Sequence, residues 1–178
     1  MCYNRHMQDV LERRMRQRRK ILFDKDDKLF DLLRLKIDDA AHTDLILWSF
    51  RLVKEKIDEL EDDIYLNERY QIVKDWASGK IKMKGAKTAI LEIHGLAKKT
   101  DDPYLIASYH AIAQALSVVH TRGHAMGFVL YDLTSKIRRF GIDMKTLEES
   151  VDHYLTLLDE VKVDRSERKW ATFIVSHF

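Results

Sequence analysis

The sequence predicts an all-α fold, a single compact bundle of about six to eight helices with no substantial sheet. Two observations carry this prediction. The chain of 178 residues contains one proline and six glycines, so it has few of the residues that strands need at their turns. Along most of the chain, apolar residues recur at spacings of three and four, which is the period of an amphipathic helix.

Composition and charge narrow the class of protein further. Of the residues, 46% are apolar and 34% are charged, which is typical of a globular domain. The single cysteine, Cys2, excludes a disulfide within the chain. No apolar run approaches the ~20 residues of a membrane span, and the first residues lack the apolar core of a signal peptide. We therefore expect a cytoplasmic protein with no membrane partner.

Residues 1–20 are predicted to form a basic N-terminal helix or arm, and residues 21–178 a single helical domain. The arm carries seven Lys and Arg against two acids, and its apolar residues at positions 7, 10, 11 and 15 have helical spacing. These cations could bind phosphate groups, but no aromatic residue lies between them, so nucleic acid is an unlikely partner. A solvated helix face is favoured, and we expect residues 21–178 to fold without the arm.

The next two segments are also predicted to be helices. Residues 29–37 have apolar positions in helical register after a run of acids, and a strand is the weaker alternative. From Ile46 to Ile64 a single apolar stripe of about five turns is expected to be buried. Five acids lie near its end and mark either a solvated helix end or a contact surface for a basic partner. These acids are Asp58, Glu59, Glu61, Asp62 and Asp63.

Clear start and stop signals follow. Asn67 is expected to cap a helix that carries Trp76 and ends at Gly79, a residue common just after helix ends. Another helix follows over residues 84–99. The strongest start signal is Asp102 followed by Pro103, because proline at the first helical position loses no hydrogen bond.

Three histidines share one stripe with small residues after this start. A glycine at position 123 and a potential capping threonine at 121 predict a kink or break near 121–123, and hence two segments, 103–120 and 122–139. The stripe consists of Ile106, His110, Ala113, Ser117, His120, His124, Gly127 and Tyr131.

The histidines raise two alternatives, a metal site or a polar helix contact. Two imidazoles one helical turn apart suit zinc, but a zinc site needs further ligands. His94 or His110 could complete a set with His120 and His124. The favoured interpretation has no cofactor, with the rings half-buried and hydrogen-bonded to side chains such as Tyr131, Gln114 or Ser117. No catalytic motif is recognisable, so the sequence gives no reason to expect an enzyme.

Several stretches together resemble the immunity proteins of bacterial polymorphic toxin systems. The central match is HTRGHAMGFVLYDLTSK, read as His-x3-His-Ala-x-Gly-x3-Tyr. The stretches HTDLILWSFRLVKEKIDELEDD, DWASGKIKMKGAKTAILEIHGLAKK and SERKWATF extend the similarity over roughly residues 22–178. The signature residues are Trp76, Gly79, His94, His120, His124, Gly127 and Tyr131.

The resemblance implies an all-helical protein that binds and neutralises a cognate toxin by protein–protein interaction. It brings no catalytic residues. The acidic residues of 58–63 are the candidate partner surface. Two alternatives stay open: a metal-binding protein or metal-dependent enzyme that uses the histidines, and a nucleic-acid binder that uses the basic arm.

Overall fold

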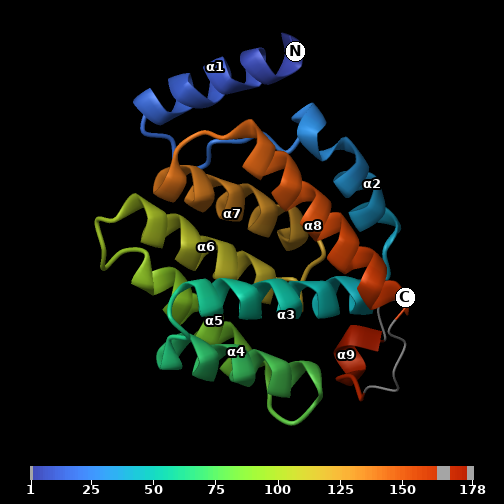
Figure 1. Ribbon diagram of the computed structural model, residues 1–178. Coiled ribbons are helices and arrows are strands. Elements are labelled where there is room, and N and C mark those ends of the chain that lie inside the picture. The colour runs from blue at the N-terminus through green and yellow to red at the C-terminus, as the bar shows by residue number, and fades with distance from the viewer. Residues whose placement is uncertain (1, 164–168, 176–178) are drawn as a thin grey trace.

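The computed structural model describes residues 2–163 and 169–175, and Figure 1 shows their arrangement. Within these ranges the chain forms nine α-helices, one short 3-10 helix and no strand. The helices are α1 (Cys2–Arg16), α2 (Asp31–Asp39), α3 (His42–Glu59), α4 (Ile64–Ala77), α5 (Met83–Leu96), α6 (Pro103–Ser117), α7 (His124–Phe140), α8 (Met144–Val163) and α9 (Thr172–Val175), with the 3-10 helix η1 (Lys28–Phe30) before α2. The all-α prediction is confirmed, and residues 29–37 are helical rather than a strand.

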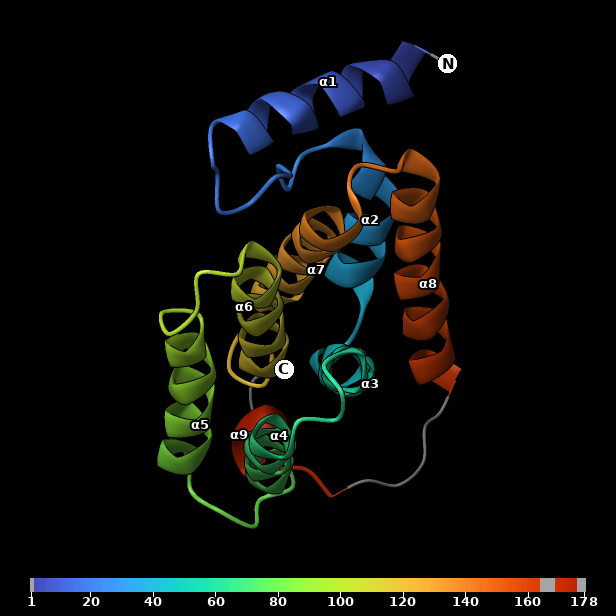
Figure 2. The same cartoon turned by 60° about the vertical axis from the view of Figure 1, so that its left-hand side comes forward.

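The antiparallel hairpin of α6 and α7 forms the centre of the bundle (Figure 2). Helix α5 packs on one side of α6, and α3 packs on another. Helix α8 lies along α3 and α2, while α4 pairs with α5. Among the described residues, no helix is both long and apolar enough to cross a bilayer.

One apolar core joins these helices, and aromatic residues hold its middle. Trp48 on α3 is fully buried, and its indole N–H donates to the carbonyl of Tyr154 on α8 at 2.9 Å. Phe128 on α7 lies edge-on to both rings, with centroids 6.2 Å from Trp48 and 5.8 Å from Tyr154. These three side chains therefore fix the spacing of α3, α7 and α8.

The N-terminal helix α1 lies across one end of the bundle (Figure 1). Its apolar face contributes Met7 and Leu11, which are 5% and 0% exposed, to the common core. Arg14 donates to the carbonyl of Leu22 at 2.8 Å and pairs with Asp27 at 3.4 Å. The division of the chain at residue 20 stays a prediction, but α1 does not stand apart from the body.

The helix boundaries agree with the sequence at two places. Asp102 caps α6, since its carboxylate accepts from the Tyr104 amide at 2.8 Å. The predicted break also exists and is slightly wider than expected, because α6 ends at Ser117 and α7 begins at His124. The chain reverses over residues 118–123, so the two halves of the histidine stripe face each other across the hairpin.

Two boundary expectations were wrong. Helix α3 ends at Glu59, and Ile64 is 78% exposed rather than part of a buried stripe. Asp63, not Asn67, caps α4, because its carboxylate accepts from the Leu66 amide at 3.0 Å. The apolar spacing predicted one continuous helix up to Ile64, whereas the cap at Asp63 starts a new helix there.

Candidate functional site

Polar side chains fill the seam between α5, α6 and α7. The Nδ1 atoms of His94 on α5 and His110 on α6 lie 3.0 Å apart. A hydrogen bond at this distance requires one ring to donate and the other to accept, so the two neutral rings hold complementary tautomers. The ring of Tyr131 on α7 lies 5.0 Å from that of His110. Two of the predicted signature residues, His94 and Tyr131, thus come together here with His110.

The hairpin continues this seam through His124 and Gln114. His124 Nδ1 lies 2.7 Å from the side-chain oxygen of Gln114 on α6. Gly127, one turn further along α7, makes room for that side chain: a Cβ at this position would lie 2.9 Å from Gln114 Cδ and nearer still to its oxygen. The favoured prediction of a hydrogen-bonded histidine in a close helix contact describes the geometry of His124.

His120 differs from that expectation. Both its ring nitrogens are buried and lack a hydrogen-bond partner among the described residues. The ring instead packs on Trp76 of α4, with centroids 4.8 Å apart. The reason is the hairpin turn, which carries His120 away from the α6–α7 seam and toward α4.

Burial lowers the pKa of all four histidines. Desolvation is the main cause for each ring, and the neighbouring His110 lowers the pKa of His94 further. Neutral rings are therefore the stable form in the seam at neutral pH. In the part of the chain that the structure describes, no three His, Cys, Asp or Glu side chains converge as metal ligands would.

Trp76 and Gly79 attach the C-terminal segment to α4. Gly79 has φ +76°, and the Lys80 and Gly79 amides donate to the carbonyls of Asp75 and Trp76 at 2.8 Å each. This is a Schellman motif, which favours glycine at the left-handed position. The Ala171 amide then donates to the carbonyl of Ala77 at 2.7 Å. Of the matched stretch SERKWATF, residues 166–168 lie outside the described residues.

A buried ion pair, which the sequence analysis missed, joins α3 to α7. Lys56 and Asp132 are 2% and 3% exposed, and their charged atoms lie 2.8 Å apart. Lys56 also donates to Ser135, and the Tyr154 hydroxyl donates to Asp132. Although burial opposes both charges, attraction between them raises the pKa of Lys56 and lowers that of Asp132. Asp132 lies on the same helix face as Phe128 and Val129. A carboxylate on such an apolar stripe was the sequence signal that could have indicated a buried charge.

The acidic turn, residues 58–63, is exposed, but several of its carboxylates form structural contacts. Lys54 lies 2.7 Å from both Asp58 and Asp62, and its contact lowers the pKa of Asp62. Glu59 pairs with Lys56 at 2.8 Å. Asp63 is the cap of α4. Carboxylates still outnumber cations in the turn.

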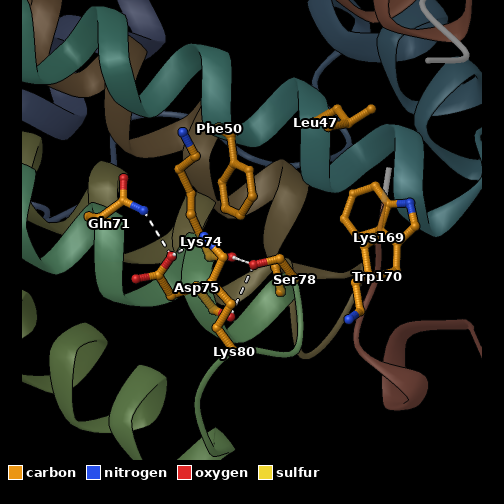
Figure 3. Close-up of a pocket in the computed structure, with 10 residues that line it drawn as sticks. Leu47, Phe50, Gln71, Lys74, Asp75, Ser78, Lys80, Lys169 and Trp170 are labelled. Atoms are coloured by element: carbon orange, nitrogen blue, oxygen red, sulfur yellow. Dashed lines mark hydrogen bonds and ion pairs between the residues drawn. The ribbon is translucent and has the colours of Figure 1, made fainter. Parts of the chain in front are cut away.

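A groove lies between α3, α4 and the C-terminal segment (Figure 3). One part is a pocket of about 360 Å³, and a second hollow of about 400 Å³ shares Leu47, Phe50 and Lys74 with it. The second hollow continues along α3 to Glu55 and Asp58, which adjoins the acidic turn. This groove was not predictable from the sequence, because its walls include segments more than 100 residues apart, such as those of Leu47 and Trp170.

Comparison with known proteins identifies the family. A model of the Imm-5 like putative immunity protein family matches residues 35–156, which is more than half of the chain. The chain therefore belongs to this immunity-protein family, as the resemblance of its histidine signature had indicated. Searches of curated proteins and of solved structures each found no match.

Proposed function

We propose that this chain binds a cognate toxin and neutralises it by covering its active surface, without catalysing a reaction. The observation that carries the proposal is membership of an immunity-protein family over residues 35–156, since such a family implies a toxin partner in general. A cytoplasmic location belongs to the same proposal. The seam histidines are accounted for by packing and hydrogen bonds, which supports a scaffold role rather than a metal-dependent reaction.

The acidic turn is the first part of the proposed contact surface. It combines carboxylates with exposed apolar side chains, because Ile64 and Tyr65, directly after the turn, are 78% and 37% exposed. Exposed apolar groups of this kind serve as anchors in protein interfaces, while surrounding charges raise the association rate with a partner of opposite charge. The matching toxin surface would therefore be basic with an apolar recess.

The test starts from the open reading frames beside this gene: where one of them encodes a toxin domain, that domain is produced with its active site inactivated by mutation. We expect the wild-type chain to bind this domain in calorimetry and to protect cells that express the active form. Ile64→Lys should raise the Kd at least about tenfold, because it removes the apolar anchor and adds a charge of the wrong sign. Leu35→Lys on α2 is the matched control, since Leu35 is 68% exposed and lies outside the turn.

Two results would contradict the proposal in different ways. Absence of binding and protection by the wild-type chain would reject toxin neutralisation itself. Equal weakening by Ile64→Lys and Leu35→Lys would reject the acidic turn as the contact surface. Stoichiometric metal in protein purified without an affinity tag would instead favour the metal-binding alternative.

A further inference from the structure

The pocket beside Trp170 has apolar walls supplied by three segments of the chain. Leu47 and Phe50 reach it from α3, Ala77 lies on α4, and Trp170 stands at the opposite side (Figure 3). Its volume of about 360 Å³ lies within the range of protein binding pockets. An apolar or aromatic side chain of a partner would find contacts on both sides here.

Cations dominate the rim of this pocket. Lys74, Lys80 and Lys169 line it, and Asp75 is the one carboxylate that the described residues contribute. Asp75 is already engaged, because it accepts from Gln71 at 3.0 Å and pairs with Lys80 at 3.2 Å. Neither Lys74 nor Lys169 forms an ion pair with another described residue; the Lys74 ammonium lies 5.0 Å from the centre of the Tyr70 ring. A carboxylate placed above the pocket would meet two cations that have no anionic partner among the described residues.

The charge changes sign along the groove. Beyond Phe50 the second hollow is bordered by Glu55 and Asp58 together with Arg51 and Lys54, and it ends at the acidic turn. The lining of this hollow has mixed charge, but Lys54 is held between Asp58 and Asp62, and the adjoining acidic turn adds further carboxylates that make this end of the groove acidic. The groove therefore has one cationic end, an apolar middle and one acidic end. A feature of this length and charge pattern fits an extended polypeptide better than a small compact ligand.

We propose that this groove receives a segment of the toxin in which an apolar side chain is adjacent to a carboxylate. The apolar side chain enters the pocket between Phe50 and Trp170, and the carboxylate faces Lys74 and Lys169. The rest of the segment runs along α3 toward the acidic turn. This inference rests on the proposed function and extends the contact surface from the turn to the C-terminal segment. It also gives the Trp76 and Gly79 signature a role, because these residues lie where the segment that carries Trp170 attaches to α4.

The experiment measures binding of the inactivated toxin domain to the double variant Lys74→Glu/Lys169→Glu. Both lysines lie at the rim rather than in the core, so the variant is expected to fold, which circular dichroism and thermal unfolding will check. We expect its Kd to rise at least about tenfold and the loss to shrink at high salt, because reversed charges repel the carboxylate. The matched control is Lys25→Glu/Lys84→Glu, which reverses two exposed charges outside the groove.

Hydrogen exchange of the wild-type complex gives an independent readout of the same surface. Toxin binding should slow amide exchange in residues 47–55, 70–80 and 169–171. If the wild-type chain binds but the double variant behaves like its control and these segments gain no protection, the groove inference is wrong while toxin binding stands. If the wild-type chain does not bind the toxin domain, both proposals are wrong.

Discussion

At the scale of single residues, Gly127 determines how closely α6 and α7 approach. A side chain at this position would meet Gln114, which is itself held by His124 at 2.7 Å. To remove this clash, Gln114 would have to move and lose its hydrogen bond to His124, or α6 and α7 would have to separate. The close approach of α6 and α7 at this point thus depends on the absence of a Cβ at position 127.

We therefore expect Gly127→Leu to destabilise the protein by about 1–3 kcal/mol or more, the typical cost of overpacking a close contact. The control is Gly95→Leu on α5, where an added Cβ has no atom within 4 Å. Chemical denaturation monitored by tryptophan fluorescence gives both unfolding free energies. Equal stability of the two variants would show that the hairpin does not need a glycine at position 127.

The ion pair of Lys56 and Asp132 shows which residue contacts could not be predicted from the sequence. A buried pair is costly to break because each partner leaves the other uncompensated. Sequence spacing placed Asp132 on the apolar face of α7 but could not show that Lys56 of α3 meets it. Pairing depends on how the helices bring together two residues that lie 76 positions apart in the chain, and that is a tertiary property.

At the scale of helices, the attachment of α1 can be tested directly. Met7 and Leu11 are buried, and burying one such side chain stabilises a protein by about 1.5–3 kcal/mol. Deleting residues 1–20 should therefore lower the melting temperature and the unfolding free energy substantially, contrary to the expectation that the arm is only a solvated face. The control variant Arg13→Gln/Arg16→Gln keeps the apolar face and should stay close to the wild type. An unchanged melting temperature after the deletion would mean that α1 contributes no net stability.

Helix positions followed well from the sequence where local signals were strong. Asp102 and Pro103 marked the start of α6, and Gly79 marked the end of α4, because these residues act through their own backbone geometry. The junction of α3 and α4 was harder. Ile64 continued the apolar spacing, yet Asp63 capped a new helix, and spacing alone does not reveal when a cap interrupts it.

In the candidate site, too, local features could be predicted from the sequence, whereas contacts between distant segments could not. The sequence identified the histidine stripe and the break near 121–123, since both are local patterns. It could not place His120 against Trp76, because that contact depends on the path of the turn between α6 and α7. The groove was not predicted for a similar reason: Trp170 reaches it only after the C-terminal segment folds back onto α4.

At the scale of the whole molecule, the half-buried histidines make stability depend on pH. In the folded protein the pKa values of His94, His110, His120 and His124 lie below the ordinary value, chiefly through burial. The unfolded chain therefore binds more protons than the folded chain once the pH falls below about 6.5. Under this condition the unfolding free energy decreases as the pH decreases. Above about pH 7 the rings are neutral in both states, and their contribution no longer changes.

The expected result is a stability plateau near neutral pH and a decline as the pH falls below about 6.5. Urea denaturation at a series of pH values measures it. His110→Gln should reduce the slope of this decline, because one proton acceptor of the unfolded state is removed. The matched substitution outside the seam is His6→Gln on the exposed face of α1. If the wild-type slope is absent, or if His110→Gln does not alter it, the seam histidines do not carry the acid sensitivity.

Below about pH 4 a second loss of stability should follow, because the pKa of Asp132 is lowered by Lys56 and its protonation breaks the buried pair.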